Sequence, residues 1–364
     1  MAVLGLVLFL LGFGLQRLAA RVPAWVESAY SRGMFPHIAR ALHTVFGWVP
    51  FSLAEALVEL LVFVTLAWLA DTVRRIALQP PRRRWGAAWR RLSALVVVLG
   101  AAYLAFILLW GLNYGRRPLA ESLGLQTRPS SVNELTDLCD DLIDRANSLR
   151  QQVREDSNGF MRLNGSIPDA LRRASLGYER ASALYPVLAG THSPPKGVWV
   201  SKLWSYTGIG GVYFPFTGEA NVNVAVPASS IPASAAHEMA HQRGFAREDE
   251  ANYIAYLVDN LHPDADFRYS GTLSALVSAM NALYAQDPGR YKELAVRYSP
   301  GVRRDLEQLD AYWNAHEGTV SRTANHINDQ YLKANMQAEG VGSYGRMVDL
   351  LLAEYRARQV GQPH

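Results

Sequence analysis

The segment from His237 to His241 contains two histidines four residues apart, with Glu238 directly after the first. On a helix, positions four apart lie on one face, so both imidazoles can point at the same position. Two neutral imidazoles suit Zn²⁺, and a catalytic zinc site needs a third protein ligand and an open position for water. Glu238 could then be the general base that takes a proton from that water.

A third ligand is expected in the next segment of the chain. Gly244 is placed to end the first helix in a left-handed conformation, and a second helix should begin soon after it. Glu248 stands four residues before Asn252, a spacing that resembles the ExxxD or ExxAN element of gluzincin peptidases. That resemblance implies Glu248 as the third metal ligand and Asn252 as the residue that orients a ligand histidine. Glu250 is the alternative ligand, and acidic residues also favour any helix N-terminus.

Further segments extend the resemblance to most of the chain. Residues 211–221 are GVYFPFTGEAN and lead to HEMAHQRGFAREDEAN, while the tail contains YLKAN at 331–335 and GVGSY beginning at residue 340. With the apolar segments near the N-terminus, these runs resemble a bacterial membrane-protein family called domain of unknown function 3810. The resemblance implies a gluzincin-like domain behind a membrane anchor, and it brings no known substrate.

The resemblance also implies where a peptide would bind. In similar zinc peptidases, a strand just before the histidine helix borders the cleft and pairs with the substrate backbone. Alternating apolar residues predict strands at 197–203, 212–216 and 221–226. The candidate residues of this substrate edge are Tyr213, Phe214 and Asn221.

Zinc peptidases also need a hydrogen-bond donor for the tetrahedral oxyanion, usually a Tyr, His or Arg from further along the chain. The candidates are His326, Tyr344 and Arg346, because they lie in the part of the tail that carries the resemblance. A packing or helix-capping role is the alternative for each of them.

Three apolar segments predict membrane spans at about 1–15, 51–70 and 92–112. A signal peptide is the alternative for the first, although no Lys or Arg precedes its apolar run. Residues 71–91 carry seven arginines, which predicts a cytoplasmic loop. Everything after Asn113 would then lie outside the cytoplasmic membrane of a bacterium. An amphipathic interfacial helix is expected near residues 37–45.

Glu55 and Glu59 interrupt the second apolar segment, one helical turn apart. An ionisable group inside a membrane suggests a function, unless it lies shallow enough to reach the headgroups. The net charge of +4 is concentrated in the arginine-rich segment, so it indicates membrane topology and no nucleic-acid partner. The single Cys139 excludes an intramolecular disulfide.

The sequence therefore predicts a mainly helical α+β protein with a membrane region (1–113) and an extracytoplasmic, zincin-like metallopeptidase domain with a small sheet (114–364). The predicted function is zinc-dependent hydrolysis of a peptide or protein substrate beside the lipid bilayer. One alternative is a zinc-binding sensor or scaffold module on a peptidase fold. The other, a channel or transporter part, depends only on Glu55 and Glu59.

Overall fold

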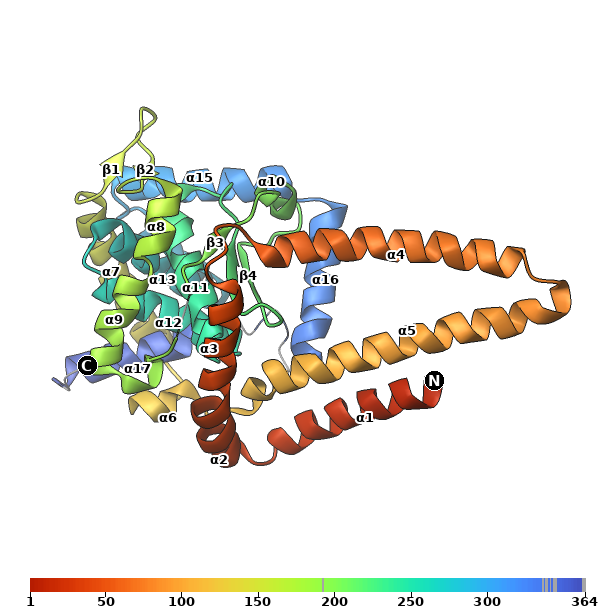
Figure 1. Ribbon diagram of the computed structural model, residues 1–364. Coiled ribbons are helices and arrows are strands. Elements are labelled where there is room, and N and C mark those ends of the chain that lie inside the picture. The colour runs from red at the N-terminus through yellow and green to blue at the C-terminus, as the bar shows by residue number, and fades with distance from the viewer. Residues whose placement is uncertain (192, 336, 338–339, 341, 343–345, 362–364) are drawn as a thin grey trace.

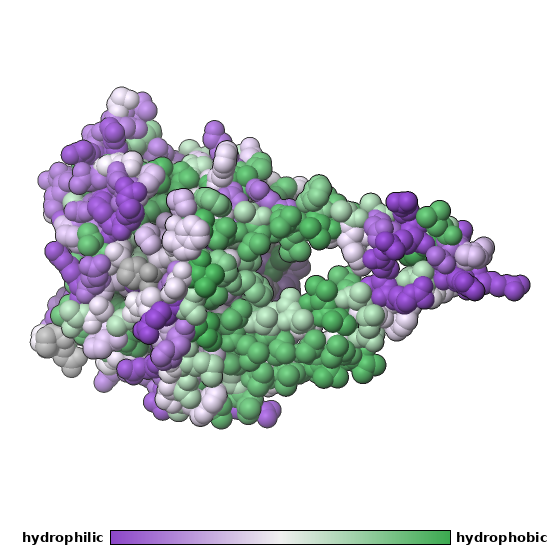
Figure 2. All heavy atoms as spheres, viewed as in Figure 1, coloured by the Kyte–Doolittle hydropathy of each residue, from purple (hydrophilic) through white to green (hydrophobic). Residues whose placement is uncertain are grey.

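The computed structural model describes residues 1–364 except 192, 336, 338–339, 341, 343–345 and 362–364. The described part is mainly helical. Three of its helices are long and apolar enough to cross a membrane: α1 (Ala2–Ala19), α4 (Leu53–Ala77) and α5 (Pro81–Leu109). They project to one side of a helical body in Figure 1 and carry most of the hydrophobic surface in Figure 2. All three predicted apolar segments are thus helical.

α4 and α5 form a long hairpin. Residues 71–91, predicted as a loop, are helical apart from residues 78–80. This connection is helical because α4 continues past its apolar part, and Pro81 occupies the first position of α5, where proline is favoured. Arg91 and Asp71 form an ion pair near the turn. Figure 1 shows the two helices diverging from this closed end toward the body, and Figure 2 shows the end as hydrophilic.

α1 packs along α5 over much of its length. A Cβ added at Gly5 would lie 2.5 Å from the backbone of Val96, and one at Gly100 would collide with the carbonyl oxygen of Gly5. Small residues of this kind let two apolar helices approach closely. α4 has no such partner, and only 6% of its apolar window is buried.

Between α1 and α4 the chain crosses the ends of the apolar helices. It does so through α2 (Pro23–Trp25), the π-helical segment η1 (Val26–Met34) and α3 (Phe35–Phe46). The helix predicted near residues 37–45 is confirmed as α3. The buried side of these segments packs with the ends of α1 and α5 and with residues near the candidate site.

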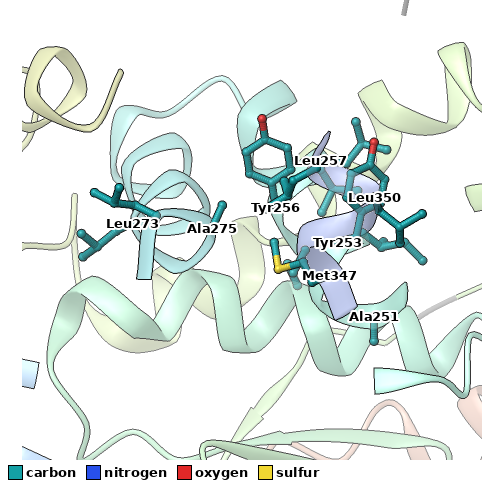
Figure 3. Close-up of a cluster of buried hydrophobic side chains, with 14 of the residues drawn as sticks. Ala251, Tyr253, Tyr256, Leu257, Leu273, Ala275, Met347 and Leu350 are labelled. Atoms are coloured by element: carbon teal, nitrogen blue, oxygen red, sulfur yellow. The ribbon is translucent and has the colours of Figure 1, made fainter. Parts of the chain in front are cut away.

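The core of the body lies between α7 (Val132–Arg150), α12 (Glu248–Leu261), α13 (Ala265–Gln286) and α17 (Met347–Gln359). Figure 3 shows α12 tyrosines beside Met347 and Leu350 of α17. A capping box formed by Ser131 and Glu134 begins α7. The remaining helical segments are α6 (Leu119–Leu123), α8 (Ile167–Arg173), α9 (Ser175–Leu184), α10 (Ser201–Ser205), α11 (Ile231–Gln242), α14 (Pro288–Ala295), α15 (Pro300–His316) and α16 (Thr319–Ala334), with 3-10 turns η2 (Gly111–Gly115), η3 (Pro186–Leu188) and η4 (Ala228–Ser230).

In the described part of the chain, five short strands form two sheets. β1 (Arg154–Glu155) and β2 (Met161–Arg162) make a hairpin away from the site. The second sheet has the order β3 (Lys196–Gly197), β5 (Glu219–Val222), β4 (Gly211–Phe214), with β4 antiparallel to β5. The strand predicted at 197–203 is wrong beyond Gly197, because the chain turns into α10 there. β4 is an edge strand of this sheet, and α11 packs against β4 and β5.

Candidate metal centre

The metal-ligating candidates are positioned by α11, the turn after it and α12. Gly244 has φ +79°, and its N–H donates to the carbonyl of His241 over 3.0 Å. The predicted left-handed glycine is therefore confirmed. A Cβ at Gly244 would also lie 2.9 Å from Asn113 Oδ1, so both the conformation and the packing require glycine. The turn brings the first residue of α12, Glu248, back beside α11.

His237, His241 and Glu248 converge on one point, with one ligand atom from each within 4.8 Å of the others. The two Nε2 atoms are 3.0 Å apart, and the Glu248 carboxylate lies 3.1 Å from His237 Nε2 and 3.7 Å from His241 Nε2. Two ligands of tetrahedral zinc, with Zn–N of about 2.05 Å, are separated by about 3.3 Å. The three donor atoms thus have the spacing and chemistry of a zinc site.

The other nitrogen of each imidazole is held by an oxygen. His237 Nδ1 lies 2.8 Å from Asn252 Oδ1, and His241 Nδ1 lies 2.7 Å from the carbonyl of Phe245. A carbonyl oxygen can only accept, so each Nδ1 is the donor and each Nε2 lone pair is left for a metal. The structure therefore brings Asn252 to the position that the sequence implied.

Of the two candidate third ligands, Glu248 lies in the cluster and Glu250 does not. The Glu250 carboxylate accepts a hydrogen bond of 2.8 Å from the N–H of Leu119 and lies 3.5 Å from Arg247. Burial raises the pKa of Glu250 to about 7. Its place on the first turn of α12 turns it toward α6 and away from the histidines.

Glu238 lies beside this cluster as a buried carboxylate. It is 4% exposed, and its Oε2 makes no hydrogen bond with any described residue. Burial raises the pKa of Glu238, and the neighbouring His237 and His241 oppose that rise. A carboxyl group with a raised pKa is better matched to proton transfer near neutrality than an ordinary one.

The charges of the ligand candidates depend on one another. Burial alone would lower the pKa of His241, but the Glu248 carboxylate outweighs it and raises the pKa to about 9. Burial alone would raise the pKa of Glu248, and the two imidazoles pull it well below its usual range.

Residues at and just after the C-terminal end of α5 form a wall of the site. The indole N–H of Trp110 donates to the carbonyl of His241 over 3.1 Å, and the two rings are 5.8 Å apart. Arg116 forms a buried, bidentate ion pair with Glu27 of η1 and donates to the carbonyl of Gly244 over 3.0 Å. The site is thus built from both the predicted membrane region and the body.

The structure adds Tyr331 to the neighbourhood of the cluster. Tyr331, on α16, accepts a hydrogen bond of 3.2 Å from the hydroxyl of Tyr114, and its ring contacts Phe106 of α5. Tyr331 is 40% exposed overall, but desolvation of its hydroxyl raises the pKa to about 12, and the Glu248 carboxylate adds to the rise. Just beyond α16, Gln337 accepts the backbone N–H of Glu248 over 3.2 Å. Tyr331 is not among the site residues predicted from the sequence, although it begins the YLKAN run at 331–335.

The structure does not bring the predicted oxyanion donors to the cluster among the residues that it describes. Tyr344 lies outside the described residues. His326 is exposed on α16, and the structure shows no contact between it and the cluster among the residues that it describes. Arg346 is exposed and lies 3.9 Å from Asp249.

The predicted substrate edge is only partly an edge. Tyr213 and Phe214 belong to β4, and the Tyr213 ring is 5.4 Å from that of Trp110. Asn221 belongs to the central strand β5, is 1% exposed and pairs with the hydroxyl of Ser52 over 2.6 Å. The Asn221 prediction was wrong because strand alternation cannot tell a central strand from an edge strand.

The two carboxylates of α4 have different surroundings. Glu55 accepts the backbone N–H groups of Trp199 and Val200 at 2.9 and 2.7 Å, which ties the helix to the body. Glu59 is exposed and lines a cavity of about 100 Å³. The remaining lining residues are Ala54, Glu55, Val58, Val200, Trp204, Val212, Phe214 and Asn221.

The comparisons with known proteins agree with the resemblance. Residues 30–352 match the model of a family described as "Protein of unknown function (DUF3810)". No curated protein matches the sequence, and no solved structure matches it. Because the family match includes the whole candidate site and far more than half of the sequence, the chain belongs to the DUF3810 family.

Proposed function

We propose that the protein is a zinc-dependent, membrane-anchored metallopeptidase. His237, His241 and Glu248 would hold the ion, and Glu238 would serve as the general base. The proposal extends beyond the family assignment, which names no activity.

The observation that carries the proposal is the buried, unpaired oxygen of Glu238 beside two oriented imidazoles. A buried carboxylate oxygen without a hydrogen bond costs about 1–3 kcal/mol or more, so stability alone disfavours it. A metal-binding module needs His237, His241 and Glu248, but it has no need for this fourth group. A group that takes a proton from water during the reaction accounts for it.

The residues divide the expected chemistry between them. A bound Zn²⁺ supplies a water with a pKa near 7 and polarises the substrate carbonyl. Glu238 takes the proton from the attacking water and returns it to the leaving amine. Asn252 and the Phe245 carbonyl keep the imidazoles oriented. The hydroxyl of Tyr331 accepts from Tyr114 and so keeps its own proton to donate to the substrate oxygen.

The orientation in the membrane is part of the proposal. Seven arginines surround the closed end of the α4–α5 hairpin, opposite the body. The positive-inside rule assigns that end to the cytoplasm, which leaves the site outside.

The test compares the full-length protein with its Glu238→Gln variant. Glutamine keeps the size of the side chain but cannot take the proton of water. We expect about one zinc per chain in both proteins, and turnover of a cleaved peptide should fall by roughly 10²- to 10⁴-fold in the variant. Metal analysis and cleavage of a peptide library, followed by mass spectrometry, measure the two quantities.

Each other outcome has a separate meaning. A parallel loss of zinc and activity would make Glu238 a structural support of the site. Stoichiometric zinc without any cleavage that depends on Glu238 would favour the sensor or scaffold alternative. Zinc retained after both His237 and His241 are replaced by alanine would contradict the metal site itself.

A further inference from the structure

The ends of α4 and α5 enclose the small sheet from its two faces. Successive side chains of a strand point to opposite faces, and on β4 these faces meet different helices. Val212 and Phe214 line the cavity formed with α4, while Tyr213 packs on Trp110 at the end of α5. A peptide paired with the edge of β4 would therefore lie between the two apolar helices.

Strands β5 and β4 also contact the first turns of α4. The first residues of α4 contact β5: Glu219 accepts the N–H groups of Leu53 and Ala54 at 3.2 and 2.7 Å. Residues one to two turns further along α4, Val58 and Glu59, line the cavity beside β4. Ala54 and Glu55 line the same cavity, so it extends from the start of α4 toward the apolar middle of this helix.

The depth of this edge follows from helix geometry. The ion pair between Arg91 and Asp71 places these residues at one level. An α-helix rises 1.5 Å per residue, so about 20 residues cross a hydrocarbon core of about 30 Å. Counted from that level, the far boundary falls near Phe51, just before α4, and near Gly111 of η2, beside Trp110. Val58 of α4 then lies about 10 Å below this boundary. The exposed side chains of Trp48 and Trp199, 77% and 93% accessible, fit an interface at this height.

The candidate metal centre therefore adjoins the membrane surface. Trp110, at the estimated boundary, donates to the carbonyl of the ligand candidate His241. Gly211 of β4 adjoins Glu238, because a Cβ there would lie 2.5 Å from Glu238 Oε1. The substrate edge, the base and the metal ligands are thus all within reach of a chain that lies at the bilayer surface.

An apolar opening continues from this edge into the membrane region. α4 and α5 diverge toward the body, and Figure 2 shows an opening between them that is flanked by hydrophobic side chains. Exposed residues of α4 along this stretch include Val58, Leu61, Val62 and Val64. α16 contacts the α5 side of this opening through Tyr331 and Phe106.

We propose that the substrates are polypeptides anchored by a transmembrane helix, cut in the extended segment at the bilayer surface, with the anchor helix between α4 and α5. This inference rests on the proposed peptidase function and names its substrate class. A soluble peptide has no part that could use the opening. A segment next to an anchor helix is held at the depth of β4 in the bilayer, because the anchor fixes its distance from the membrane.

The first experiment varies only the height of the cleaved segment. The full-length enzyme is reconstituted in vesicles with a substrate that has one apolar transmembrane helix, about eight randomised residues and a fluorescent domain. In the matched substrate, a Gly/Ser spacer of about 20 residues, spanning roughly 25 Å, separates the helix from the randomised segment. Both substrates are anchored, so their surface concentrations are equal. We expect cleavage of the adjacent segment to be faster by about tenfold or more.

The second experiment narrows the space beside β4. Val58→Trp should fill the cavity of about 100 Å³ and slow cleavage of the anchored substrate, with zinc content unchanged. Leu60→Trp places the same side chain on the opposite side of α4 and should leave the rate near that of the wild type. Equal slowing by both variants would contradict a specific role for this face.

The outcomes separate this inference from the function on which it rests. Equal rates for adjacent and displaced segments, or for a soluble peptide, together with dependence on Glu238, would overturn the inference and leave the peptidase standing. Absence of cleavage that depends on Glu238 for every substrate would overturn both. Preferential cleavage next to the anchor, lost in Val58→Trp, supports both.

Discussion

Glu248 and Glu250 show how two carboxylates on the same helical turn acquire different roles. Glu248 faces both histidines, whereas Glu250 accepts the N–H of Leu119. Asn252 touches His237 only through the nitrogen that faces away from the cluster. The three side chains therefore differ in their relation to the candidate metal position: Glu248 faces it, Asn252 contacts the far side of His237, and Glu250 points elsewhere.

Substitutions at these three positions should rank accordingly. Glu248→Gln should weaken zinc binding most, because it removes a charged ligand. Asn252→Ala should weaken it by roughly 10- to 100-fold, as the loss of a partner that orients a ligand usually does. Glu250→Gln should leave zinc affinity unchanged, since glutamine can still accept the N–H of Leu119. Competition titration with a zinc chelator measures all three, and stronger weakening by Glu250→Gln would reverse the ligand assignment.

Tyr331 is the residue for which the structure changes the expected mechanism. Its hydroxyl accepts a hydrogen bond from Tyr114, and the Glu248 carboxylate contributes to its raised pKa. The structure shows no contact between His326 and the cluster among the residues that it describes. Tyr331→Phe should lower kcat by roughly 10²- to 10³-fold, the usual cost of an oxyanion donor, with KM and zinc content almost unchanged. His326→Ala is the comparison and should have little effect. A loss confined to His326→Ala would return the role to that residue.

At the scale of elements, β4 matters because it approaches α11 so closely. The approach depends on Gly211, where an added Cβ would lie 2.5 Å from Oε1 and 2.7 Å from Cγ of Glu238. At the neighbouring Gly210, an added Cβ would lie 3.5 Å from Ser234 Oγ, which is ordinary van der Waals contact. The absence of a side chain at Gly211 therefore leaves the space that the Glu238 carboxylate occupies.

Two alanine variants test this contact. Gly211→Ala should displace the Glu238 carboxylate and lower turnover by about tenfold or more, since misplacement by about 1 Å can cost 10²-fold. Zinc content should remain, because none of the ligands touches the new methyl group. Gly210→Ala should behave like the wild type in both assays. Wild-type turnover in Gly211→Ala would show that Glu238 is not held where the geometry places it.

At the scale of the whole molecule, the apolar helices and the body share one site. Arg116 is 5% exposed, pairs with Glu27, and its guanidinium lies 4.2 Å above the ring of Phe245. Through the carbonyl of Gly244 it also holds the turn between α11 and α12. The predicted division at residue 113 therefore cuts through the surroundings of the metal centre.

Breaking this ion pair should destabilise the site from a distance. Glu27→Ala leaves Arg116 buried without its partner, which typically costs about 3–5 kcal/mol. The apparent melting temperature of the full-length protein in detergent should fall clearly, and zinc affinity with it. Arg172→Ala, at an exposed ion pair, should change stability by no more than about 1 kcal/mol. An equal effect of the two variants would contradict the coupling.

The sequence alone determined the features that depend on short spacings. The four-residue separation of His237 and His241, the left-handed Gly244 and the position of Glu248 after it follow from helix periodicity and glycine conformation. The length of the apolar segments predicted α1, α4 and α5 for the same reason, since a span is a local property.

Only the tertiary structure decided which distant residues meet at the site. Glu248 and Glu250 are equally acidic in the sequence, and their separation comes from the packing of α12 against α11 and α6. Strand order, and hence the burial of Asn221, depends on pairing between segments that alternation cannot reveal. Trp110 donates to the carbonyl of His241, and Tyr331 contacts Tyr114 and Phe106, because long-range packing brings α16 against the end of α5.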